Sequence, residues 1–284
     1  MKQSIQKFAD IGFRMHLRCW EPDQASPNSR QFLLVHGLAS NAKTWDQVGQ
    51  SLAEVGHTAV AIDQRGHGLS QQVDDGYDFA TITADLTTLL DQLKWDQPIL
   101  IGQSWGGNVM TSFGVNYPKR AAGLVMVDGG FLDFGSSEAA WEEVEKRLTP
   151  PNLSKTSMEM IRSILGSSHP DWTEEGIDGT LANLWINEDG VLDRRLKLTN
   201  HMTIVEHLYH QMPMNLYPKI ERPVLICAAG NEDQPEGERK AWIENAVQHI
   251  PNATYKWFAE TDHDIHVHRP RELVDTILNW TETF

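Results

Sequence analysis

A serine with the surroundings of a covalent nucleophile lies in the sequence Gly102-Gln103-Ser104-Trp105-Gly106. This pattern, G-x-S-x-G, directly follows a short apolar run and directly precedes a stretch of helix length. Between a strand and a helix, the serine sits on a turn so tight that the residues two positions away must be small. The turn holds the hydroxyl above the sheet edge, and the positive end of the helix points at it. The motif therefore predicts acyl-transfer chemistry at Ser104.

A serine hydroxyl is a poor nucleophile unless a base accepts its proton. The chain has 12 histidines, of which His263, His266 and His268 follow the last expected strand, residues 254–259. His263 comes first in the loop after that strand, where an imidazole can lean back over the sheet edge. We therefore predict His263 as the base, with His266 as the alternative. The spacing of the three histidines matches no established zinc site, so no metal is expected.

The third member of such a triad is a carboxylate that orients the imidazole and stabilises its cation. Glu232 and Asp233 follow one expected strand, and Asp128 follows another. We predict Asp233 as this acid, with Asp128 as the second choice and Glu232 as the third. Structural roles in turns or salt bridges are expected for three further aspartates, Asp63, Asp262 and Asp264.

The tetrahedral intermediate of acyl transfer carries an oxyanion that needs preorganised N–H donors. The backbone of Trp105, directly after the nucleophile, is one expected donor. The other is expected from Leu38, after the apolar run that ends at His36-Gly37. Gly37 lets the backbone pass close to a substrate, and His36 is expected to support this loop through hydrogen bonds rather than to act as a catalyst.

Short apolar runs without alternation are typical of strands that helices cover on both faces. Five such runs occur, at residues 31–35, 58–62, 98–101, 122–127 and 223–229, and each ends at a polar residue or a glycine. Stretches of helix length lie between them, at residues 44–55, 81–93, 106–117 and 238–249. Before them, strict alternation over residues 13–19 predicts a half-exposed strand, which residues 4–8 can join as a hairpin. The pattern predicts a mostly parallel, doubly wound α/β sheet, whose active site lies at the carboxyl ends of the strands.

The segment 131–219 contains no clear strand run and is rich in tryptophan, methionine, leucine and charged residues. We interpret it as a helical cap inserted between two core strands, so that residues 1–130 and 220–284 form the two parts of the core. A separate helical domain is less well supported, because the sheet pattern resumes at Val224. Side chains of the segment that could line a pocket are Trp141, Trp172, Trp185, Met202, Met212 and Met214, although most of them are expected to pack the helices together.

The bulk properties of the 284-residue chain restrict its partners and compartment. Its net charge of −15 argues against nucleic acid and anionic membrane surfaces, since both require a basic face. The two cysteines, Cys19 and Cys227, provide neither a disulfide framework nor a metal site. No apolar signal-peptide region or membrane-length run is found, so the cytoplasm is the expected compartment. Nothing in the sequence predicts the oligomeric state.

Taken together, these motifs resemble the α/β-hydrolase superfamily, in its cap-bearing, esterase- and lactonase-like subgroup. The segments that carry the resemblance are His36-Gly37, 63–70 (Asp-Gln-Arg-Gly-His-Gly-Leu-Ser), 102–107, 230–233 and 263–270. The resemblance covers nearly everything outside 131–219. It implies that the histidine seven residues before Pro270 is catalytic, which favours His263, and it implies no cofactor. Related dehalogenases and epoxide hydrolases carry aspartate at the nucleophile position, so Ser104 speaks against those reactions.

The predicted function is hydrolysis of a carboxylic ester or lactone, with a small-molecule acyl substrate, through an acyl-enzyme on Ser104. One alternative is a carbon–carbon bond hydrolase that acts on a diketone-like substrate with the same triad. Another is a ligand receptor on the same scaffold that turns over slowly or not at all.

Overall fold

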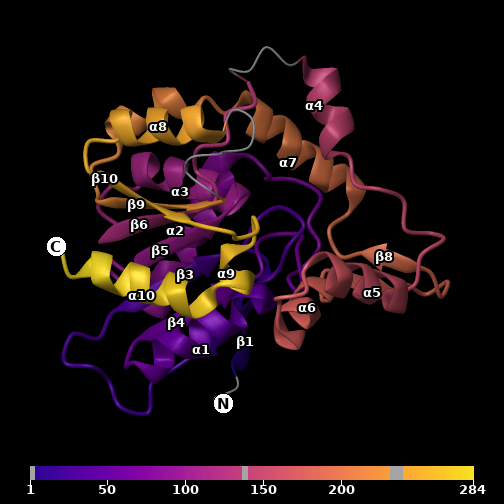
Figure 1. Ribbon diagram of the computed structural model, residues 1–284, viewed down its shortest axis with the longest axis horizontal. Coiled ribbons are helices and arrows are strands. Elements are labelled where there is room, and N and C mark those ends of the chain that lie inside the picture. Colours follow the sequence, from indigo (N-terminus) through magenta and orange to yellow (C-terminus); the bar gives the residue numbers. More distant parts are fainter. Residues whose placement is uncertain (1–3, 136–139, 231–238) are drawn as a thin grey trace.

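A computed structural model of the protein describes residues 4–135, 140–230 and 239–284. At its centre is an eight-stranded sheet with the order β1-β2-β4-β3-β5-β6-β9-β10 (Figure 1). The strands are β1 (Ile5–Asp10), β2 (Arg14–Trp20), β3 (Gln31–Val35), β4 (Thr58–Ile62), β5 (Ile99–Gln103), β6 (Gly123–Val127), β9 (Val224–Ala229) and β10 (Ala253–Phe258). The six strands from β4 to β10 pair in parallel, whereas β1 and β2 form an antiparallel extension.

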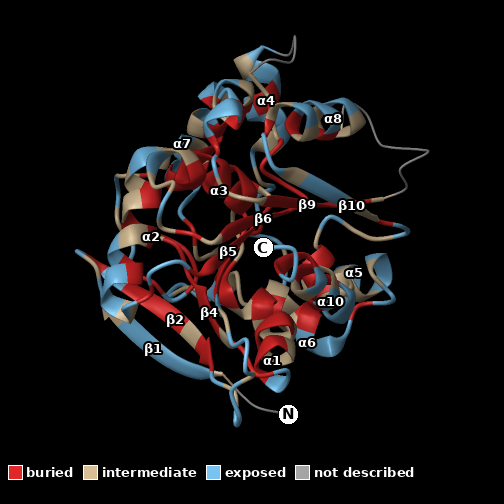
Figure 2. Ribbon diagram, turned by 90° about the vertical axis from the view of Figure 1, so that its left-hand side faces the viewer, coloured by how far each residue is buried: buried red, intermediate tan, exposed pale blue. Residues whose placement is uncertain are grey.

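Alternate side chains of the central strands enter two separate cores, one on each face of the sheet. On β3, for example, Leu33 and Val35 belong to one core and Phe32 and Leu34 to the other. Figure 2 shows that the central strands are buried while β1 is exposed along most of its length. This double burial explains why the strands read as continuous apolar runs in the sequence.

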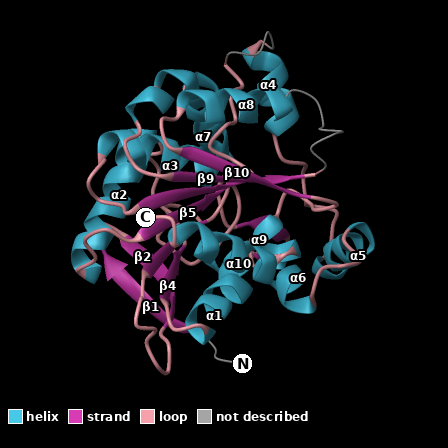
Figure 3. Cartoon of the chain, turned by 60° about the vertical axis from the view of Figure 1, so that its left-hand side comes forward, coloured by secondary structure: helices cyan, strands magenta, loops and turns pink. Residues whose placement is uncertain are grey.

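Helices cover both faces of the sheet (Figure 3). The first core includes residues of α2 (Phe79–Leu93), α3 (Trp105–Asn116) and α8 (Arg239–His249). The second core includes residues of α1 (Asp46–Glu54), α9 (Ile265–His268) and α10 (Pro270–Thr281), and a short 3-10 helix, η1 (Ala42–Trp45), precedes α1. The predicted doubly wound α/β fold is confirmed. In the described parts of the chain, no helix is long and apolar enough to cross a membrane.

One sequence-based expectation about β2 is wrong. The alternation over residues 13–19 puts His16 on the polar side of a half-exposed strand, together with Arg14 and Arg18, but only 1% of His16 is exposed. Its Nδ1 lies 2.8 Å from Oδ2 of Asp63, and its backbone N–H donates to Oγ of Ser70 at 2.8 Å. The loop after β4 therefore covers this side of β2, a contact between distant segments that alternation within one strand cannot reveal.

The segment 131–219 lies between β6 and β9, and most of the regular structure in its described residues is helical. It contains α4 (Trp141–Leu148), α5 (Met158–Ser168), α6 (Glu174–Leu181), α7 (Leu198–His210) and two 3-10 turns, η2 (Pro213–Asn215) and η3 (Tyr217–Lys219). It also contains a hairpin that the sequence analysis did not predict, β7 (Leu184–Ile186) with β8 (Leu192–Arg194). Strands of three residues are too short to show a period, and the hairpin turn depends on the Asn187 side chain, which accepts from the backbone N–H of Asp189 and Val191.

Candidate active site

Ser104 lies on a sharp turn between β5 and α3, with φ 54° and ψ −122°. A non-glycine residue rarely adopts a positive φ, so the surrounding packing must impose this conformation. A Cβ added to Gly102 would lie 2.1 Å from the carbonyl oxygen of Gly106, and one added to Gly106 would lie 2.7 Å from the carbonyl oxygen of Val35. The two glycines of the motif are therefore needed for the close approach of backbone segments, as the sequence analysis argued.

Backbone hydrogen bonds fix this turn to the sheet. The N–H of Ser104 donates to the carbonyl of Val127 at the end of β6 (2.9 Å), and the carbonyl of Ser104 accepts from Gly107 in the first turn of α3 (2.8 Å). Ser104 is partly exposed. The geometry thus presents a hydroxyl at the carboxyl edge of the sheet and at the positive end of a helix.

His263 and Asp128 form a short hydrogen bond at the same edge of the sheet. Nδ1 of His263 lies 2.5 Å from Oδ2 of Asp128. Asp128 follows β6 directly, and its carboxylate is completely buried, whereas 44% of the His263 side chain is exposed. The carboxylate also accepts from the backbone N–H of Ala229 at 2.9 Å. Because Nδ1 is occupied by Asp128, Nε2 is the ring nitrogen left for proton transfer.

Gln103, the last residue of β5, connects the His263 loop to the strand that precedes Ser104. Its side-chain amide donates to Oδ1 of Asp264 (3.2 Å) and to the carbonyl oxygen of His263 (3.5 Å). Gln103 is the residue directly before Ser104, so this contact holds the histidine loop beside the serine turn. Its position inside the G-x-S-x-G motif gives no sequence signal for this contact.

The surroundings of His263 determine its protonation. Burial disfavours the charged imidazole, but the hydrogen bond to Asp128 and the charge of its carboxylate outweigh burial and raise the pKa of His263. A raised pKa means that the imidazole is neutral only above it. A reaction that needs a neutral base is therefore lost as the pH falls through that value.

The other two histidines of the loop are placed differently. His266 is completely buried, and its ring packs on Trp45 with centroids 4.3 Å apart. Burial lowers the pKa of His266 to about 3. Nδ1 of His268 accepts from the backbone N–H of Asp262 at 3.1 Å. Of the three, His263 is the one that the structure places against Asp128.

The two expected oxyanion donors lie on segments that meet at the serine turn. Trp105 is the first residue of α3, so its N–H has no acceptor within the helix. In the parts of the chain that the structure describes, no protein group accepts from the N–H of Leu38. A Cβ on Gly37, directly before Leu38, would lie 3.0 Å from Cβ of Ser104, so this backbone passes beside the serine.

His36 supports the loop that carries Leu38. It is completely buried, its Nε2 accepts from the backbone N–H of Gln64 (3.0 Å), and its Nδ1 donates to the carbonyl of Gly37 (2.7 Å). Burial lowers the pKa of His36, so the ring is neutral, as these one-donor, one-acceptor contacts require. Neighbouring His67 has the same pattern, with Nδ1 donating to Arg65 and Nε2 accepting from Ala39.

Two of the predicted acids, Asp233 and Glu232, lie outside the described residues. Asp128, the second choice of the sequence analysis, is the carboxylate that the structure brings to His263. Asp63 has the structural role that was expected, because its carboxylate accepts from the backbone N–H of Ala42 (2.6 Å) and Leu69 (2.7 Å) as well as from His16.

Arg239 is a charged neighbour of the site that sequence reasoning missed. Its Nη1 lies 2.6 Å from both carboxylate oxygens of Asp128. The sequence gives no local signal for this contact, since the two residues are 111 positions apart.

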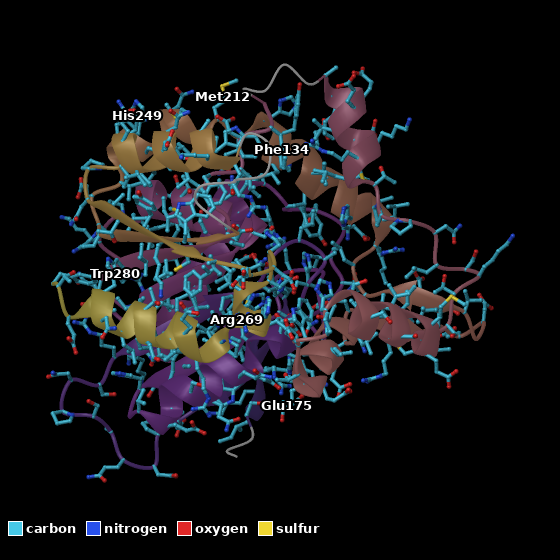
Figure 4. All side chains as sticks on the ribbon, in the orientation of Figure 1. Phe134, Glu175, Met212, His249, Arg269 and Trp280 are labelled. Atoms are coloured by element: carbon cyan, nitrogen blue, oxygen red, sulfur yellow. The ribbon has the colours of Figure 1, made fainter. Side chains whose placement is uncertain are left out.

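Contacts between the segment 131–219 and the core occur at the carboxyl edge of the sheet. Residues after β3, β4, β5 and β10 all take part. The hydrogen bonds are Asn41 Nδ2 to Gly179 O (2.9 Å), Asn200 Nδ2 to Val73 O (2.9 Å), Asn108 Nδ2 to Gln211 Oε1 (2.7 Å) and Trp172 Nε1 to Asp262 Oδ2 (3.0 Å). At the first end of the segment, Phe134 packs edge-on against Trp242 of α8, with ring centroids 5.8 Å apart (Figure 4).

A polar hollow of about 750 Å³ lies elsewhere, between β2, the start of α1 and the segment 131–219. Its lining residues include Arg18 and Asp46, which form a bidentate ion pair with both hydrogen bonds at 2.6 Å. Glu175 on α6 also lines it (Figure 4). None of Ser104, Asp128 and His263 lines this hollow, so it is separate from the candidate active site.

Comparisons with known proteins agree with the fold. The family model described as alpha/beta hydrolase fold matches residues 31–149. Epoxide hydrolase B of Mycobacterium tuberculosis is 33% identical over 116 residues, which make up 40% of this chain and 32% of that protein. The 2-(acetamidomethylene)succinate hydrolase of Mesorhizobium japonicum is 26% identical over 194 residues, 68% of each chain. The matched region thus spans about a third of the length of the first of these relatives.

The crystal structure of E-2-(acetamidomethylene)succinate hydrolase has the same fold. It aligns with a TM-score of 0.78 and 19% sequence identity over 98% of this chain and 99% of that chain. The parallel sheet, the serine turn at the end of β5 and the family match over residues 31–149 together show that the chain has the α/β-hydrolase fold.

Proposed function

We propose that this protein is a serine hydrolase that cleaves a carboxylic ester or lactone, with Ser104 as nucleophile, His263 as base and Asp128 as the orienting acid. The observation that carries the proposal is the 2.5 Å hydrogen bond between His263 and the buried Asp128, at the sheet edge where Ser104 lies on its strained turn. Asp128 takes the role for which the sequence analysis favoured Asp233.

The proposed reaction has two half-reactions. Oγ of Ser104 attacks the substrate carbonyl while its proton passes to Nε2 of His263, and the resulting imidazolium is stabilised by Asp128. The backbone N–H groups of Leu38 and Trp105 stabilise the oxyanion of the tetrahedral intermediate. The intermediate collapses to an acyl-enzyme as His263 returns the proton to the leaving alcohol. Water then attacks the acyl-enzyme by the same route and releases the acid.

Similarity to an epoxide hydrolase does not extend the proposal to epoxides. An epoxide has no carbonyl carbon on which a serine could form an acyl-enzyme, and residue 104 is a serine. An oxyanion site and a serine–histidine pair suit substrates with a carbonyl group. The proposed substrate class is therefore the carboxylic esters and lactones.

Changing Asp128 to asparagine tests the assignment of the acid. We expect Asp128→Asn to reduce kcat for an aryl ester by about 10⁴-fold, because asparagine neither favours the reactive tautomer of His263 nor stabilises its cation. The matched variant is Asp233→Asn, for which we expect kcat within about threefold of the unchanged protein. Thermal unfolding of both variants separates a loss of chemistry from a loss of folding.

The opposite ranking would return the acid to Asp233. If Asp233→Asn lost activity by orders of magnitude while Asp128→Asn kept it, the hydrogen bond between Asp128 and His263 would have no catalytic role.

We further propose that the segment 131–219 is a cap that shapes the substrate pocket. Its hydrogen bonds to the core involve residues after β3, β4, β5 and β10, where a substrate of Ser104 must enter. One contact is next to the proposed base, since Asp262 accepts from Trp172 Nε1 (3.0 Å) and lies 2.8 Å from Nδ1 of His169. A cap in this position would exclude water and select the acyl or alcohol group.

Substitution of Trp172 tests the cap. Trp172 is 7% exposed and packs with Ile177 and Leu181 of α6 and with Val267. We expect Trp172→Ala to change the ratio of kcat/KM between long-chain and short-chain esters by about tenfold, while a small organophosphonate still labels Ser104. The control is Met160→Ala on neighbouring α5, because Met160 is 52% exposed. An equal loss for every substrate and for labelling would refute the selective role.

A further inference from the structure

The carboxylate of Asp128 is shared between the imidazole of His263 and the guanidinium of Arg239. On one side Nδ1 of His263 lies 2.5 Å from Oδ2, and on the other Nη1 of Arg239 lies 2.6 Å from each oxygen. The N–H of Ala229 is the third donor. The carboxylate is completely buried, while 26% of the Arg239 side chain is exposed. Arg239 begins α8, and it reaches an acid that lies at the end of β6.

We propose that Arg239 is a positioning residue that holds the Asp128 carboxylate and opposes protonation of His263, and that it thereby sets the acid limit of activity. This inference rests on the proposed triad. It adds a fourth residue, which acts on the base through the acid and does not touch the substrate.

The net charge of the three side chains explains why Arg239 opposes protonation of His263. With Arg239 present, the group Asp128–Arg239–His263 has a net charge of zero when the imidazole is neutral and +1 when it is protonated. Without Arg239, the same group has a charge of −1 with a neutral imidazole and zero with a protonated one. Around a buried carboxylate the neutral state is favoured, because an unbalanced charge there is costly. Arg239 therefore favours the neutral imidazole, which is the form that accepts the proton of Ser104.

The other charged groups around His263 belong to its own loop and to neighbouring segments. Asp264, the next residue, raises the pKa of His263, as Asp128 does, while Arg239 lowers it. The charge of His263 in turn helps to lower the pKa of buried His266. Among the described residues, Arg239 is therefore the cation whose removal should raise the pKa of His263 most directly.

A variant without the guanidinium tests this role. We expect Arg239→Met to move the acid limb of the kcat/KM–pH profile to higher pH, because the neutral imidazole of His263 is then less favoured. Arg239→Lys keeps the positive charge but not the planar guanidinium group. Its acid limb should therefore lie closer to that of the unchanged protein than the acid limb of Arg239→Met does. Lys240→Met is the control, because it removes one positive charge from the next position of the same helix.

Titration of His263 by NMR gives a second measurement that does not require catalysis. The His263 ring signal, assigned by its loss in His263→Ala, should titrate at higher pH in Arg239→Met than in Lys240→Met. If neither the NMR titration nor the acid limb moves, the inference is wrong and Arg239 has only a structural role, which would appear as a lower Tm. If the pKa of His263 measured by NMR rises but the acid limb of kcat/KM stays in place, Arg239 acts on His263 as inferred. His263 is then not the base, and the proposed function is what fails.

Discussion

Replacing Ser104 with alanine is expected to reduce kcat for ester hydrolysis by about a millionfold. The turn between β5 and α3 places one hydroxyl at the sheet edge, and its removal leaves no atom there that can form the acyl-enzyme. Covalent labelling by an organophosphonate should disappear with the activity. Both are measured directly, by steady-state hydrolysis of an aryl ester and by mass spectrometry of the labelled peptide.

The fold should survive this change, since Ser104 makes its anchoring contacts through the backbone. The matched control is Ser112→Ala, eight residues further along the chain in α3. The hydroxyl of Ser112 accepts from Nε2 of Gln211 at 2.8 Å and is part of no catalytic contact. This variant should lose some thermal stability and keep its labelling. A labelled peptide that lacks Ser104 would refute the central proposal.

The sheet could be predicted from the sequence because it is buried on both faces. A strand covered by helices on either side must be apolar throughout, so β3 and β4 were found with the bounds that the structure gives them. The serine turn was predictable for a similar reason. Its glycines are needed because a Cβ at either position would lie only 2.1 or 2.7 Å from a backbone carbonyl oxygen, and such a requirement is visible in the residue types themselves.

The choice of acid could not be made from the sequence. Asp128 and Asp233 each follow a strand of the parallel sheet, and β6 and β9 are neighbours, with Val127 paired to Cys227. Strand order therefore brings the carboxyl ends of β6 and β9 to the same edge. The contact that favours Asp128 depends on side-chain direction, on the N–H of Ala229 and on Arg239, none of which leaves a periodic signal. The hairpin β7–β8 and the buried His16 escaped prediction for the same reason.

Replacing His263 with alanine is expected to cost about 10⁵- to 10⁶-fold in kcat, close to the loss of the serine itself, because the two residues act as one unit. The imidazole is 44% exposed, so added imidazole should enter the vacated space and restore part of the activity.

The matched variant is His266→Phe. In the described parts of the chain neither ring nitrogen of His266 has a hydrogen-bond partner, and the ring is buried against Trp45. Phenylalanine should therefore keep kcat within about threefold and leave Tm equal or higher, because replacing a buried unpaired polar group with an apolar one of similar shape costs little. Loss of activity in His266→Phe, with His263→Ala near the unchanged protein, would move the base by three residues and leave the hydrogen bond between Asp128 and His263 without a catalytic purpose.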